Sequence, residues 1–359
     1  MLRKPLLFLL PLTLFLLGCP GTDEPGTDPF DTFDRGALLE GWVDYFGTAY
    51  AEFEVELTDF DNRTQAYFNT PSGPGLIALQ ESFTRTYTAW QRLSPVLTGE
   101  AERLRLRARI NTYPTDVDLI RENSSTGDFN LELPSNTAAQ GFPALEYLLF
   151  AQTSNGTSSI DPTHPDVAAN RAYFRALVGT ISSLTVEAAE EWRGASAEAY
   201  IANDGNSATA SIDRTVNDFL FYYERNLRAG KVGIPAGVFS DDPLPELVES
   251  VYQGQSRDYL LAALRASEDF FTNHGLADYL DALDVVRDGQ PLSQTISEQF
   301  VTAGRLAEGY ENDFEEIVRT DNVRMLELYD ALQRNVIFLK VDMLQALNVN
   351  VDYVDADGD

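Results

Sequence analysis

The chain has 359 residues and a formal net charge of −30, with 56 acidic and 26 basic side chains. This acidic excess argues against nucleic-acid binding, which needs a basic surface, and is typical of a solvated acidic surface or a saline habitat. Hydrophobic residues make up 44% of the chain and only one cysteine is present, so a folded core is expected and an intramolecular disulfide is excluded.

The N-terminus predicts export. Two basic residues precede an apolar run over 6–17, which is short of the roughly 20 residues that span a bilayer. Residues 1–18 therefore read as a signal peptide. The sequence Leu16-Leu17-Gly18-Cys19 resembles a bacterial lipoprotein signal, which predicts lipidation of Cys19. An ordinary cleaved signal with an incidental cysteine is the alternative.

Residues 19–35 are rich in Pro, Gly, Thr and Asp and lack apolar periodicity, so they predict a flexible acidic tether. Together, the signal and the tether predict an exported protein of the bacterial cell envelope. We expect it at the outer membrane, held to the membrane through the lipid anchor only.

Beyond the tether, apolar residues recur at three- and four-residue steps, which predicts an all-α fold. Two short segments, 117–120 and 348–354, are the best strand candidates. The weakly periodic segment 194–207 is the candidate boundary between an N-terminal helical bundle, 36–200, and a C-terminal one, 201–359. The predicted helices lie near 36–69, 76–93, 99–111, 143–151, 165–192, 208–228, 244–272, 276–287, 293–320 and 322–347.

The usual catalytic patterns are missing from the sequence. It has two histidines, His164 and His274, and both lie in predicted loops. No HExxH, ExxH or GxSxG motif occurs, and neither does a P-loop or a Gly-rich dinucleotide fingerprint. Catalysis by the common routes is therefore poorly supported.

In the segment QGFPALEYLLF, residues 140–150, one carboxylate, that of Glu146, is surrounded by apolar residues in the sequence. Pro143 suits the first turn of a helix because it lacks an N–H. Glu146 would then stand near the positive end of the helix dipole. Its apolar neighbours predict partial burial, which requires a partner, a raised pKa or a cation. A structural role and a role in a ligand cleft both remain open.

This segment resembles the signature of the imelysin-like family, bacterial exported proteins linked to iron acquisition and once described as peptidases. The family motif is GxHxxE; Gly141 and Glu146 match its ends, and Pro143 replaces its histidine. Segments 110–116, 231–237 and 328–359 resemble the same family, in its lipoprotein lineage. The resemblance implies two halves, each like a four-helix bundle, packed around a cleft that holds the signature helix.

The resemblance also implies a binding site at the remnant motif, Gly141, Pro143 and Glu146. Glu146 is the candidate metal ligand, for iron or another divalent metal, and would need further ligands because one carboxylate cannot hold iron alone. Asp116 is a possible cleft residue, or else caps the next helix. Lys231 could pair with an acid across the cleft, but we expect a cation at a helix C-terminus.

We therefore predict a non-enzymatic protein of iron acquisition. Its partners would be a metal ion, a metal complex or an outer-membrane uptake protein. A metallopeptidase of the imelysin type is one alternative, although the sequence offers no clear group to activate water. A helical scaffold that docks another exported protein is the other.

Overall fold

The computed structural model describes residues 33–152 and 156–351. The predicted signal peptide, Cys19 and most of the tether lie outside the described residues, as does the end of the chain from 352. The regular secondary structure of the described part is helical apart from one two-stranded hairpin, which confirms the all-α fold. None of its helices is long and apolar enough to cross a membrane.

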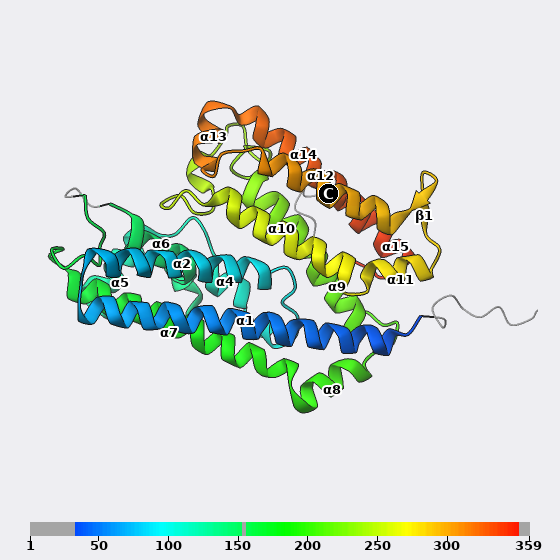
Figure 1. Ribbon diagram of the computed structural model, residues 1–359, viewed down its shortest axis with the longest axis horizontal. Coiled ribbons are helices and arrows are strands. Elements are labelled where there is room, and N and C mark those ends of the chain that lie inside the picture. Colours follow the sequence, from blue (N-terminus) through cyan, green and yellow to red (C-terminus); the bar gives the residue numbers. More distant parts are fainter. Residues whose placement is uncertain (1–32, 153–155, 352–359) are drawn as a thin grey trace, which may run out of the picture.

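The helices form two layers, seen one above the other in Figure 1. The lower layer is built on the long helix α1, against which α2 and α7 pack. Its elements are α1 (Arg35–Asn69), α2 (Gly73–Leu93), α3 (Glu100–Arg103), α4 (Leu106–Ile110), α5 (Val117–Thr126), η2 (Pro134–Ala139), α6 (Gly141–Phe150), α7 (Val167–Ala189), η3 (Glu190–Trp192) and α8 (Gly194–Ala202).

In the upper layer, α10 packs against α2 below it and against α12, which in turn packs against α14. A π-helix, η4, contacts both α10 and α14. The elements of this part are α9 (Ser211–Phe221), η4 (Tyr222–Gly233), η5 (Pro245–Leu247), α10 (Ser256–Asn273), α11 (Leu276–Ala282), β1 (Val286–Arg287), β2 (Gln290–Pro291), α12 (Leu292–Glu308), α13 (Phe314–Thr320), α14 (Asn322–Ile337), η6 (Phe338–Met343) and α15 (Leu344–Ala346).

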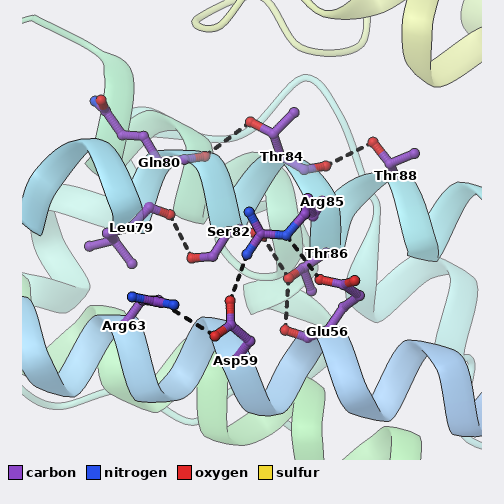
Figure 2. A network of polar contacts seen from close by, with 10 residues as sticks. All are labelled: Glu56, Asp59, Arg63, Leu79, Gln80, Ser82, Thr84, Arg85, Thr86 and Thr88. Atoms are coloured by element: carbon purple, nitrogen blue, oxygen red, sulfur yellow. Dashed lines mark hydrogen bonds and ion pairs between the residues drawn. The ribbon is translucent and has the colours of Figure 1, made fainter.

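The pair α1 and α2 forms the base on which the site rests. Figure 2 shows Arg85 of α2 reaching across to Glu56 and Asp59 of α1, at 3.4 and 2.6 Å. Nearby, Thr86 Oγ1 donates to the carbonyl of Glu56 at 3.0 Å. The arginine pairs are half exposed and contribute little, at most about 1 kcal/mol each. Aromatic burial along α1 contributes more, since Trp42, Phe53 and other rings of that face are fully buried.

Buried apolar residues of both layers belong to one continuous core. The predicted division at residue 200 falls inside α8, and it stays a prediction. The weakly periodic segment 194–207, the candidate boundary, contains that helix, which is rich in alanine, the strongest helix former.

Several predicted elements need correction. The strand candidate at 117–120 is the first turn of α5, which Asp116 caps. The helix predicted over 208–228 begins at Ser211 and continues as a π-helix through Gly230 to Gly233. The helix predicted over 99–111 is broken at Arg105, whose φ is +54°.

Two long predicted helices are shorter than expected. Helix α10 begins at Ser256 rather than at 244, and the preceding residues 248–255 form a turn-rich segment, called here the 248–255 loop. The helix predicted over 276–287 ends at Ala282, and a hairpin follows. Its turn is Asp288-Gly289, both with positive φ, and an Asp-Gly pair favours this tight hairpin.

The predicted buried faces are mostly confirmed. On α7, all seven predicted positions, from Tyr173 to Ala188, are buried. On α14 the predicted stripe is confirmed at Leu332 and Val336, which are buried, but it differs in the first turns. Val323 and Leu326 are 62% and 39% exposed, while Met325 and Leu328 are buried in their place.

Candidate functional site

The signature segment folds as α6, which begins at Gly141, two residues before the predicted start. Pro143 is the third helical residue, where its missing N–H leaves no intrahelical hydrogen bond unmade. Glu146 is the sixth, in the second turn. The carboxylate of Glu146 therefore does not make the expected contact with the N-terminus of the helix. Helix α6 is buried around most of its circumference, including Pro143 and Glu146.

Gly141 holds the start of α6 against the end of α4. Its φ is +76°, a conformation that L side chains rarely adopt. A Cβ at this position would lie 2.1 Å from the carbonyl oxygen of Ile110. Only glycine permits this close approach of two backbones, so Gly141 fixes the position of α6 against α4.

The carboxylate of Glu146 is bound by the 248–255 loop. Its Oε1 accepts hydrogen bonds from Ser250 Oγ at 3.0 Å, from the Tyr252 N–H at 3.1 Å and from the Gln253 N–H at 2.7 Å. All three donors lie more than a hundred residues further along the chain. Glu146 is 2% exposed. It therefore joins the signature helix to the segment that leads into α10.

Burial raises the pKa of the Glu146 carboxyl to about 7. The hydrogen bonds from Gln253, Ser250 and Tyr252 act in the opposite direction, and the nearby charge of Glu249 adds to the rise. At neutral pH the group is thus close to half protonated. The sequence predicted burial with a partner, a raised pKa or a cation; the first two are found together.

This shift predicts a pH dependence of stability. Below pH 4.5 Glu146 is protonated in both the folded and the unfolded chain; between 4.5 and about 7 the unfolded chain loses the proton first. The free energy of unfolding of the native protein should fall over this window, relative to Glu146→Gln, by about 3 kcal/mol. Urea titrations of both proteins from pH 4 to 8 measure the difference. If the free energies of unfolding of the two proteins changed in parallel with pH, burial would not shift the pKa of Glu146.

A second buried carboxylate, Glu249, stands beside the first. It is 1% exposed and forms an ion pair with Lys231 Nζ. Its Oε1 also accepts from Gln91 Nε2 at 2.7 Å, and the same oxygen accepts from the side chains of Tyr87 and Asn111 at 3.1 and 2.8 Å. We call these five residues, with Glu146 and Ser250, the interlayer cluster. They come from α2, α6, η4, the 248–255 loop and the end of α4.

Lys231 lies in the last turn of η4, as a helix C-terminal cation would, but it is 3% exposed. Its ammonium donates to Gln91 Oε1 at 2.8 Å as well as to Glu249. Burial lowers the pKa of Lys231, while the Glu249 carboxylate opposes that change. Lys231 thus lies at a helix C-terminus, as expected, and it also pairs with an acid, Glu249, which is the alternative that the sequence left open.

Asp116 lies apart from this cluster. Its exposed side chain accepts from the Leu119 N–H at 2.9 Å and caps α5, the local role that the sequence suggested. The neighbouring Asp118 is also exposed and pairs with Arg121 at 3.1 Å. Among the described residues, neither of these carboxylates shares a contact with Glu146.

Sequence reasoning did not identify Glu249, Ser250, Gln91, Tyr87 or Asn111. Each stands in a segment whose pattern reads as ordinary helix or loop. One signal was present in retrospect: Glu249 is flanked by Val248 and Val251. That apolar setting resembles the setting of Glu146.

A cavity of about 850 Å³ borders α6 on the side of α5 and α7. Tyr147 and Leu148, which follow Glu146, line it, and so does Tyr252, whose N–H binds the Glu146 carboxylate. The rings of Tyr147 and Tyr252 contact each other edge to face at 5.3 Å. On the opposite side, Phe142 stacks on Tyr87 at 4.6 Å and fixes α6 against α2.

The donor set does not suit a bare metal ion. Among the described residues, no three side chains of His, Cys, Asp or Glu lie close enough together to hold one. The two buried carboxylates of the cluster already accept hydrogen bonds, and Glu249 also faces an ammonium group. A metal ion would have to displace Lys231 or compete with its charge.

Comparison with known proteins agrees with the fold. A family model described as Imelysin, Peptidase M75, matches residues 47–336. An imelysin-like protein from Psychrobacter arcticum is similar in structure, with a TM-score of 0.70 and 19% identity over 89% of this chain and 97% of that one. No protein with a curated description matches the sequence.

A second similar structure is that of a protein from Parabacteroides distasonis described as an iron-regulated protein A precursor. Its TM-score is 0.70, with 16% identity over 90% of this chain and 97% of that one. At these identities the likeness extends to the fold alone. The shared fold covers nearly the whole length of both relatives.

Proposed function

The chain belongs to the imelysin family, and from this premise we propose that it is an exported binding protein of iron acquisition whose cargo is chelated iron rather than a bare ion. The iron link is supported by the family and by the iron-regulated precursor from Parabacteroides distasonis, whose fold this chain shares.

One observation carries the choice of cargo: three of the four oxygens of the two buried carboxylates in the interlayer cluster already accept hydrogen bonds. Glu249 accepts from a lysine, a glutamine, a tyrosine and an asparagine, and Glu146 accepts three hydrogen bonds on one oxygen. A chelated metal brings its own oxygen or nitrogen ligands, so the protein need only recognise the outside of the complex. Cavities with polar walls beside the cluster offer room for such a molecule.

Calorimetric titration of the mature protein at pH 7 tests the proposal. The probes are anaerobic Fe(II), Cu(II) and a panel of ferric complexes with hydroxycarboxylate, hydroxamate and catecholate chelators. We expect one-to-one binding of at least one complex, and binding of the bare ions weaker by about a hundredfold. Tight one-to-one binding of bare Fe(II) would contradict the proposal, as would failure of every complex to bind.

The peptidase alternative has one specific observation in its favour. A buried glutamate whose pKa is about 7 is matched to proton transfer at neutral pH. If the protein were a peptidase, it would cleave an unfolded substrate in an EDTA-sensitive manner, and Glu146→Gln would abolish that cleavage. We expect no such turnover.

We also propose that the protein is anchored in the outer membrane through a lipid on Cys19, a position outside the described residues. Replacing Cys19 with serine should move the protein from the membrane fraction to the soluble periplasmic fraction and abolish its labelling by radioactive palmitate. Unchanged membrane association would reject the anchor and leave the binding function untouched.

A further inference from the structure

A second cavity, of about 590 Å³, opens between α3 and α4 on one side and α9 and η4 on the other. Its wall carries three arginines, Arg105, Arg107 and Arg214, against two acids, Glu102 and Asp218. The wall thus has one more positive than negative charge, in a chain whose net charge is −30. A local reversal of sign of this kind favours an anionic ligand. We call this cavity the arginine pocket.

The three arginines are not equally available. Arg107 is committed to the fold: it pairs with Asp218 at 2.9 Å and donates to the Ser94 carbonyl. Arg214 pairs with Glu102 at 2.5 Å, but both side chains are about half exposed, so this pair is easily exchanged. Among the described residues, none forms an ion pair or hydrogen bond with the guanidinium of Arg105.

The backbone of Arg105 holds a left-handed conformation, with φ 54° and ψ 41°, in the break between α3 and α4. A residue other than glycine pays a steric cost in this region. The break places an unpaired arginine at the pocket wall instead of continuing the helix. Two cations with exchangeable or absent partners, Arg214 and Arg105, therefore line the same cavity.

We propose that the arginine pocket binds a small anion with at least two carboxylates. The carboxylates pair with Arg105 and Arg214. Guanidinium and carboxylate groups match in geometry as well as in charge. The pocket adjoins the interlayer cluster, because Asn111 lines it and also donates to Glu249 at 2.8 Å.

This inference deepens the proposed function. Binding of an iron-loaded ligand in the pocket rests on the proposed function, whereas binding of the metal-free anion does not. Polycarboxylates such as citrate chelate ferric iron, so the same ligand could reach the pocket free or loaded with metal. Separate titrations with metal-free citrate and with its ferric complex distinguish these two sources.

Calorimetry at pH 7 and low salt, with citrate as the probe, tests the pocket. Arg105→Gln and Arg214→Gln should each weaken citrate binding by at least about tenfold. Arg63→Gln is the matched control, because it removes the same charge from an exposed site on α1 that pairs only with Asp59. Thermal melting of each variant checks that it folds, which is expected for exposed positions.

The outcomes separate the two proposals. If metal-free citrate binds through the arginines but no ferric complex binds, the pocket stands and the chelated cargo is rejected. If a ferric complex binds and Arg105→Gln does not weaken it, the cargo stands and the pocket is rejected. Absence of citrate binding to the native protein, with or without iron, also rejects the pocket.

Discussion

Replacing Lys231 with methionine is expected to lower the free energy of unfolding by about 3–5 kcal/mol, because Glu249 would lose its cation in a site closed to water. Lys231 is 3% and Glu249 1% exposed, so solvent cannot compensate for the missing charge. The Gln91, Tyr87 and Asn111 donors would remain, but neutral hydrogen bonds do not replace an ammonium group. Urea unfolding at pH 7 measures the change.

Two further variants control this experiment. Arg63→Met breaks the exposed pair with Asp59 and should cost less than about 1 kcal/mol. The double variant Lys231→Met with Glu249→Leu removes both charges and should recover at least half of the loss, since a buried pair can often be replaced by apolar groups. A Lys231→Met protein as stable as the native one would mean that the pair is not buried in solution.

Replacing Gly141 with alanine is expected to destabilise the protein by about 3–5 kcal/mol, since backbone strain and overpacking add at one position. The added methyl would lie 2.1 Å from the Ile110 carbonyl oxygen, and the φ of +76° is unfavourable for alanine. Relief of this clash requires α6 to move away from α4. That movement would draw Glu146 away from the 248–255 loop, so cargo binding should weaken as well.

Gly47→Ala is the matched control for this change. Gly47 lies inside α1, and a Cβ there would meet nothing within 4 Å. The same substitution should therefore stabilise the protein, by about 0.5–1 kcal/mol, through helix propensity. Destabilisation by both variants would point to a general effect of the methyl group, and tolerance of Gly141→Ala would refute the close contact between α4 and α6.

The sequence was most informative where periodicity was long and uninterrupted. The helices around α1, α2 and α7 follow directly from apolar steps of three and four residues. The burial of Glu146 followed from its neighbours within one helix. The hairpin after α11 was missed although its Asp-Gly turn is a local signal, because the helical pattern before it was extended too far.

The partners of Glu146 could not be predicted, because they depend on tertiary contacts. Its donors lie in the 248–255 loop, where Ser250 and Gly254 have positive φ and turn the chain out of the expected helix. That loop gives three hydrogen bonds to Glu146, over a hundred residues away in the chain. For the same reason, the sequence could not identify Glu249 as the partner of Lys231.

Anomalous scattering from crystals grown with a ferric complex gives the most direct test of the claim that iron is carried in chelated form. We expect a single iron position in a cavity beside the interlayer cluster, with its coordination completed by atoms of the chelator. Iron bound directly by Glu146 and Glu249, with no chelator present, would contradict the account.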